Sequence, residues 1–83
     1  MTETEARSLV VDCLAAIAPD ADLGRLAGDD SLRDELDLDS LDVLTLAEEL
    51  ARRTGQELLE HDYPSLATLD GAVALLLERS ADR

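Results

Sequence analysis

Apolar residues near the N-terminus recur at the three- and four-residue spacing of an amphipathic helix. Thr2 and Glu5 precede these apolar residues and have the spacing of a capping box, in which each side chain accepts a hydrogen bond from the other residue's backbone. The apolar stripe consists of Ala6, Leu9, Val10, Cys13, Leu14 and Ile17. Because Pro19 disfavours helical geometry at the residue before it, we expect this first helix to end near Ala18.

The chain between Pro19 and Leu36 shows no sustained helical period. Gly24, Gly28 and the Asp29-Asp30-Ser31 cluster are typical of turns, and they predict a long loop. Loops of this length in small domains often carry function. The residues expected to anchor the loop to the core are Leu23, Leu26, Leu32 and Leu36.

A second helix is predicted over residues 40 to 54, with Gly55 suited to the left-handed geometry that ends many helices. Its inner stripe is Val43, Leu46, Ala47 and Leu50. At about 100° per residue, Leu41 lies roughly 140° from the centre of that stripe and Leu44 lies on its flank. Leu41 should therefore be exposed to solvent.

The last part of the chain predicts a short helical turn around Pro64 and then a final helix capped by Thr68. The inner face of this helix would be Leu69, Ala72, Val73, Leu76 and Leu77. Its charged end, residues 80–83, is expected to fray. Taken together, the pattern predicts one all-α domain over residues 1–83, a small four-helix bundle of three longer helices and one short helix.

Composition narrows the classes of function. The 83 residues carry a net charge of −13, from twenty acids against seven arginines, so binding to nucleic acid or an anionic membrane is unfavourable and partners should be basic. With Cys13 as the single cysteine and one histidine, we expect neither an internal disulfide nor a metal site. No apolar run is long enough to cross a membrane, and the N-terminus is acidic where a signal peptide is basic. We therefore expect a cytoplasmic monomer.

The segment from Leu36 to Asp42 places one hydroxyl among several carboxylates at the start of the second helix. Asp39 can be the N-cap and Asp42 the third helical residue, which leaves Ser40 first in the helix with a free side chain. A phosphodiester formed there would lie beside unpaired backbone N–H groups. Serine at a helix start is also commonly only a cap, and the residues alone leave both interpretations open.

Asp39-Ser40-Leu41 resembles the Asp-Ser-Leu signature of acyl carrier proteins, at the mid-chain position that this family uses. Further matching positions are Asp42, Leu46, Leu50, Leu58 and the Thr68-Leu69-Asp70 helix start, so the resemblance covers nearly the whole chain. It implies that Ser40 Oγ bears 4′-phosphopantetheine, added from coenzyme A by a magnesium-dependent phosphopantetheinyl transferase. The arm would hold acyl groups as thioesters for fatty acid or polyketide-type biosynthesis.

The resemblance also implies a carrier, not an enzyme, that presents substrates to acyl-loading and synthase enzymes with basic docking patches. The docking surface would consist of Asp37, Asp39, Leu41, Asp42, Leu44 and Glu48. Glu49 would belong to its rim, but both glutamates can instead pair with Arg52 and Arg53 at helical spacing. An acyl-chain pocket would be lined by Leu46, Leu50, Leu58, Leu66, Leu69 and Val73, with Ala72, although core packing explains the same residues.

Several positions depart from the family pattern. Asp37 stands where the family often has glycine, and Thr45, Ala51 and Arg52 stand where bacterial fatty-acid carriers often have acids. Peptidyl carriers tend to have a Gly-Gly pair before the serine, and this chain lacks it, so a peptidyl carrier is the less favoured branch.

Three other functional classes compete with the carrier. The first is an unmodified acidic module in which Ser40 only caps its helix and the helix face binds a basic protein. A calcium loop built from Asp37, Asp39 and Asp42 is disfavoured, because it would need glycine at the sixth position and an oxygen ligand at Leu41. For an enzyme, no nucleophile with an adjacent base can be assembled, and His61 and Asp62 are assigned no catalysis.

Overall fold

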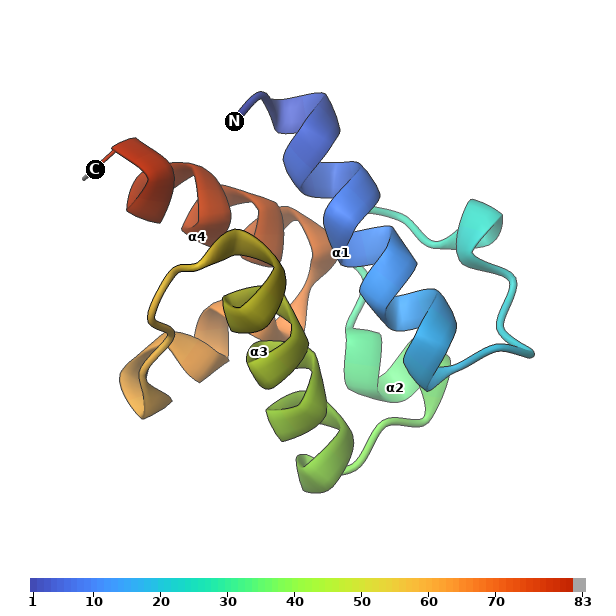
Figure 1. The fold of residues 1–83 in the computed structure, drawn as a ribbon. Coiled ribbons are helices and arrows are strands. Elements are labelled where there is room, and N and C mark those ends of the chain that lie inside the picture. Colours follow the sequence, from blue (N-terminus) through green and yellow to red (C-terminus); the bar gives the residue numbers. More distant parts are fainter. Residues whose placement is uncertain (82–83) are drawn as a thin grey trace.

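The computed structural model describes residues 1–81, and these form an all-α bundle (Figure 1). Its long helices are α1 (Glu3–Ile17), α3 (Ser40–Thr54) and α4 (Leu69–Ala81). Between them lie the five-residue helix α2 (Leu32–Leu36) and two 3-10 helices, η1 (Leu23–Arg25) and η2 (Glu60–Ala67). No strand occurs in residues 1–81. The predicted helical bundle, including the short helix around Pro64, is therefore confirmed.

The capping box predicted for α1 is present. Thr2 N donates to Glu5 Oε1 at 2.9 Å, and Glu5 N donates to Thr2 Oγ1 at 3.1 Å. The helix ends at Ile17, one residue before the expected position and two before Pro19. Local signals thus decide both ends of this element.

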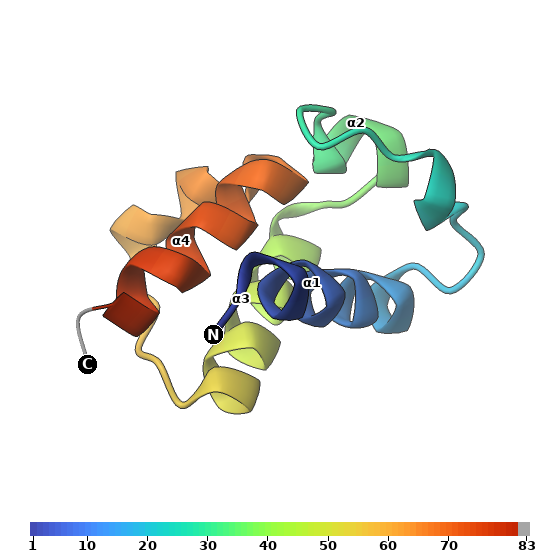
Figure 2. The same ribbon diagram turned by 90° about the horizontal axis from the view of Figure 1, so that it is seen from above.

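The core is aliphatic and lies where α1 packs against both α3 and α4. Seen from above, α4 lies on one side of α1, and the segment with η1 and α2 extends beyond the other (Figure 2). Buried residues include Cys13, which fills core space and whose thiol pKa is raised by burial. The full buried set is Ala6, Val10, Cys13, Leu14, Leu32, Leu38, Leu46, Ala47, Leu50, Leu66, Leu69, Ala72, Val73, Leu75 and Leu76.

The stretch predicted as one long loop is more ordered than expected. It contains η1 and α2, because Ser31 Oγ accepts a hydrogen bond from Asp34 N at 3.3 Å and so caps a short helix whose first residue, Leu32, is buried. Asp70 N donates to Gly28 O at 2.9 Å, which holds the loop against the start of α4. A Cβ on Gly28 would lie 2.3 Å from Asp70 Oδ1, so glycine permits this close approach.

Thr68 caps α4 as predicted, since its Oγ1 accepts from Gly71 N at 2.9 Å. The expected fraying is wrong for residues 80 and 81, which are helical. Ser80 Oγ accepts from Gln56 Nε2 at 3.3 Å, which ties this end of the helix to the segment after α3. Residues 82 and 83, the rest of that expectation, lie outside the described part of the chain. Leu75 is buried although it lies outside the predicted inner face.

The N-terminus and the start of α3 lie at opposite ends of the molecule. Met1 and the end of α4 lie together at one end, whereas α3 starts at the opposite end (Figure 1). Within the described residues, no helix has both the length and the apolar character needed to cross a membrane.

Candidate functional site

The start of α3 carries a reciprocal cap made by two aspartates. Asp42 N donates to Asp39 Oδ1 at 2.9 Å, and Asp39 N donates to Asp42 Oδ2 at 3.2 Å. Ser40 is the first helical residue and is exposed, and its hydroxyl has no hydrogen-bond partner among the described residues. Because Asp39 supplies the cap, the Ser40 Oγ is free to react.

The chain that leads into this site makes a tight reversal. Asp37 ends α2 in the left-handed conformation, with φ 54° and ψ 46°. The Arg33 carbonyl accepts hydrogen bonds from Asp37 N and, at 3.0 Å, from Leu38 N. Leu38 is buried in the core. Ser40 is therefore held between a buried anchor on one side and the packed helix α3 on the other.

We expect Asp37→Gly to stabilise the protein. A Cβ in the left-handed region costs about 1–2 kcal/mol, less for aspartate, and glycine removes this cost. The free energy of unfolding in urea should rise by about 0.5–1 kcal/mol. Asp37→Ala is the matched control, because it removes the same carboxylate and keeps the Cβ, and it should be less stable than the glycine variant. Equal stability of the two variants would show that the backbone at this position is unstrained.

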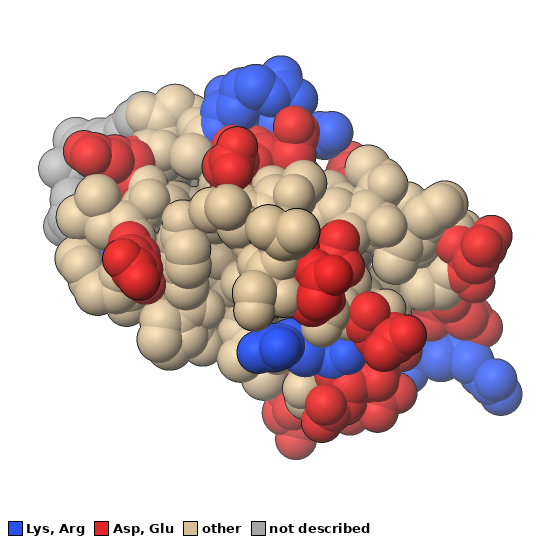
Figure 3. All heavy atoms as spheres, turned by 90° about the horizontal axis from the view of Figure 1, so that it is seen from below, with Lys and Arg blue, Asp and Glu red and all other residues tan. Residues whose placement is uncertain are grey.

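The predicted docking residues lie around the first half of α3. Leu41 is 72% exposed and Leu44 is 37% exposed, so the expected exposure of Leu41 is confirmed. Asp37, Asp39 and Glu48 are exposed, and Asp42 is half-buried. The face seen from below carries many acidic side chains, and its few arginines lie beside acids (Figure 3). An exposed apolar centre with acids around it suits a partner with basic groups around an apolar contact.

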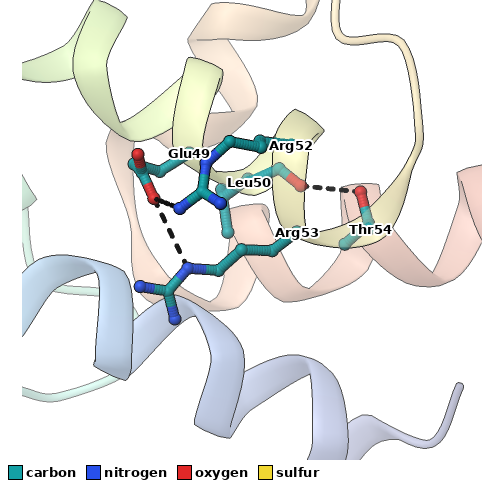
Figure 4. Close-up of polar contacts among 5 residues, drawn as sticks. All are labelled: Glu49, Leu50, Arg52, Arg53 and Thr54. Atoms are coloured by element: carbon teal, nitrogen blue, oxygen red, sulfur yellow. Dashed lines mark hydrogen bonds and ion pairs between the residues drawn. The ribbon is translucent and has the colours of Figure 1, made fainter.

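The two adjacent glutamates of α3 differ in their environments. Glu49 is half-buried and accepts from Arg52 Nη2 at 2.7 Å and from Arg53 Nε at 3.4 Å (Figure 4). The hydrogen bond from Arg52, with that from Arg53, lowers the pKa of Glu49. Glu48 is exposed and makes no ion pair within residues 1–81. Its charge is therefore available to a partner, whereas that of Glu49 is compensated within the helix.

A cavity of about 420 Å³ opens beside Ser40, with walls from α2, α3 and η2. Its lining residues are Arg33, Ser40, Val43, Glu60, Tyr63, Pro64, Leu66 and Ala67. Leu66 is the member of the predicted acyl-chain pocket that lines it. Of the remaining members, Leu46, Leu50, Leu69 and Val73 are buried in the core and Leu58 is half-buried against it.

Most of these lining residues were not predicted from the sequence. They come from three separate helices, and the hydrophobic pattern of one helix does not show which residues of another lie beside it. The available signals were weak: Tyr63 is the lone aromatic residue, and Pro64 precedes the buried Leu66.

These residues fit a covalently held phosphopantetheine. Ser40 offers an unpaired hydroxyl, the cavity beside it has an apolar wall from Val43, Pro64 and Leu66, and Arg33 places a cation at the same cavity. For the calcium interpretation, residues 1–81 hold no group of three or more His, Cys, Asp or Glu side chains placed to bind a metal ion.

The sequence matches one family model. The model describes the phosphopantetheine attachment site and covers residues 8–76, which include α3 and all the lining residues of the cavity. A search of curated proteins found no match. Proteins of this family are carriers that hold covalently attached 4′-phosphopantetheine. The match covers most of the chain, and on that basis the chain belongs to the phosphopantetheine attachment site family.

Proposed function

We propose that Ser40 is the attachment residue and that the protein carries acyl intermediates for fatty acid or polyketide-type biosynthesis. The single observation that supports this role is the free, exposed Ser40 hydroxyl at the start of α3, beside a cap that Asp39 supplies. The proposed partners are phosphopantetheinyl transferase and acyl-loading and synthase enzymes with basic docking patches. We further propose that the protein acts as a cytoplasmic monomer.

Once the arm is attached at the Ser40 Oγ, the chain's own residues take no part in the chemistry of the acyl group. Asp39 and Asp42 fix the start of α3, and the helix N-terminus favours an anionic group at its first residue. When bound, the group supplies a terminal thiol on which acyl chains are held as thioesters. Leu41 and Glu48 present an apolar contact and a charge to partners, which supply the chemistry.

Sheltering of the acyl chain by Leu46, Leu50, Leu58, Leu66, Leu69 and Val73 is part of this proposal. A route inward would begin at Leu66, which lines the cavity beside Ser40 and belongs to the core.

Intact mass tests the proposal. Wild-type protein treated with coenzyme A, Mg²⁺ and a broad-specificity phosphopantetheinyl transferase should gain one phosphopantetheine unit. An unchanged mass would leave the unmodified acidic interaction module as the better interpretation. Mass spectrometry of the protein purified from its native host would then identify the thioester, because an aminoacyl cargo indicates a peptidyl carrier and an acyl or ketoacyl cargo supports the proposed pathway.

Leu41→Ala should slow loading by the transferase. Leu41 is 72% exposed, so its loss costs the fold little, but it removes the apolar centre of the docking surface. We expect kcat/KM for loading to fall about five- to tenfold, which corresponds to about 1–1.4 kcal/mol. Leu59→Ala is the matched control, since Leu59 is also exposed, at 41%, but lies directly before η2 and away from α3 in the sequence. Equal rates for both variants would place the docking contact elsewhere.

A further inference from the structure

We propose that Arg33 binds the phosphodiester that joins the arm to Ser40, and so holds the root of the arm against the cavity between α2, α3 and η2. The inference rests on the proposed attachment at Ser40. It assigns a role to a side chain outside the serine motif and outside the docking surface.

The backbone places Arg33 close to the attachment site. Its carbonyl accepts from Asp37 N and Leu38 N, which closes the turn that leads directly into Asp39 and Ser40. Arg33 and Ser40 then line the same cavity, although they are seven positions apart in the sequence. The left-handed conformation of Asp37 produces this juxtaposition, because it reverses the chain between α2 and α3.

Among the arginines of residues 1–81, Arg33 also differs from the others because its side chain makes no ion pair. The remaining arginines within residues 1–81 each make an ion pair with a carboxylate, and these are Arg7, Arg25, Arg52, Arg53 and Arg79. Arg33 is exposed and makes no ion pair within the same part of the chain, even though Glu60 lines its cavity. A free cation is notable in a chain of net charge −13.

A phosphodiester on Ser40 would meet strong local repulsion without a cation. Asp37, Asp39 and Asp42 lie within three residues of Ser40. A guanidinium binds phosphate oxygens through two parallel N–H donors, a geometry that an ammonium cannot reproduce. Arg33 is the described cation that the fold brings to the same cavity, and the N-terminus of α3 adds a favourable dipole.

The experiment compares apo and phosphopantetheine-loaded protein by NMR and by thermal unfolding. In wild type, the Arg33 Nε–Hε resonance should shift on loading, whereas that of Arg25, which lies in η1 and pairs with Asp22, should stay unchanged. We define the loading effect as the Tm of the loaded protein minus the Tm of the apo protein. At low salt, this effect should be about 2–5 °C lower in Arg33→Gln than in wild type. Arg25→Gln is the matched control, because it removes the same charge, and it should show the wild-type response. The difference should shrink in high salt.

Complete loading is verified by intact mass before either measurement. If Ser40 gains no phosphopantetheine, the proposed function itself fails. If loading is complete but the Arg33 resonance does not move, the Arg33 assignment is overturned and the attachment at Ser40 stands. The same holds if Arg33→Gln and Arg25→Gln respond equally to loading, because the effect is then one of net charge alone.

Discussion

Ser40→Ala should abolish the attachment of phosphopantetheine completely. The reaction forms a phosphodiester at the Ser40 Oγ, and the residues on either side of Ser40, Asp39 and Leu41, have no hydroxyl group that could replace it. Treatment with coenzyme A, Mg²⁺ and transferase should leave the intact mass of this variant unchanged, whereas wild type gains one unit. Peptide mapping of loaded wild type should place the added mass on the segment that contains Ser40.

The fold should not depend on this hydroxyl. Ser40 Oγ makes no hydrogen bond within the described residues, and the cap of α3 comes from Asp39, so the free energy of unfolding should change by less than about 0.5 kcal/mol. Ser8→Ala is a suitable control, since it removes another exposed serine hydroxyl, on α1, and it should load normally. Loading of a folded Ser40→Ala variant would assign the arm to another residue.

Elements set by local signals were predictable from the sequence. The bounds of α3 follow from Asp39 as cap and Gly55 as terminator, and both residues act in this way, with Gly55 at φ 70°. The same holds for Thr2, Glu5 and Thr68, whose partners lie three residues away. The helical periodicity alone predicted that Leu41 is exposed to solvent. In each case the physical interaction lies within one helical turn, where the sequence displays it directly.

Features that depend on long-range contacts were not predictable. Leu32 was expected to anchor the loop to the core and is buried, but the short helix α2 that it begins was not predicted. The cavity beside Ser40 joins residues from α2, α3 and η2, which only the tertiary arrangement brings together. Asp62 shows the same difficulty, because its neighbour His61 drew attention in the sequence while its main side-chain partner lies 17 positions away.

Asp62 joins η2 to α4. Its side chain is 6% exposed, and it accepts hydrogen bonds from Leu59 N at 2.9 Å and from Arg79 Nη2. His61 Nε2 lies 3.4 Å from the same carboxylate. The hydrogen bond from the Leu59 backbone, with the Arg79 guanidinium, lowers the pKa of Asp62. The carboxylate thus accepts the backbone hydrogen bond at the start of η2, and it also pairs with Arg79, whose side chain is 29% exposed.

Asp62→Ala should therefore destabilise the fold strongly. It removes the cap of η2 and leaves Arg79 without its carboxylate, at a cost of about 2–4 kcal/mol in the free energy of unfolding at pH 7. For a domain of this size, Tm should fall by at least about 8 °C. Urea and thermal unfolding measure both quantities. Asp22→Ala is the matched control, since Asp22 pairs with Arg25 at 3.9 Å on the surface and should cost less than about 0.5 kcal/mol.

The contribution of Asp62 to the free energy of unfolding should decrease at acidic pH. A carboxyl whose pKa is lower in the folded state stabilises the fold above its ordinary pKa of about 4, and this contribution is lost as pH falls through the folded-state value. The stability difference between wild type and Asp62→Ala should be full at pH 6–7 and should shrink as the pH is lowered below about 4. A difference that stays constant from pH 7 to pH 3 would mean that packing of the Asp62 side chain, rather than its charge, holds η2 against α4.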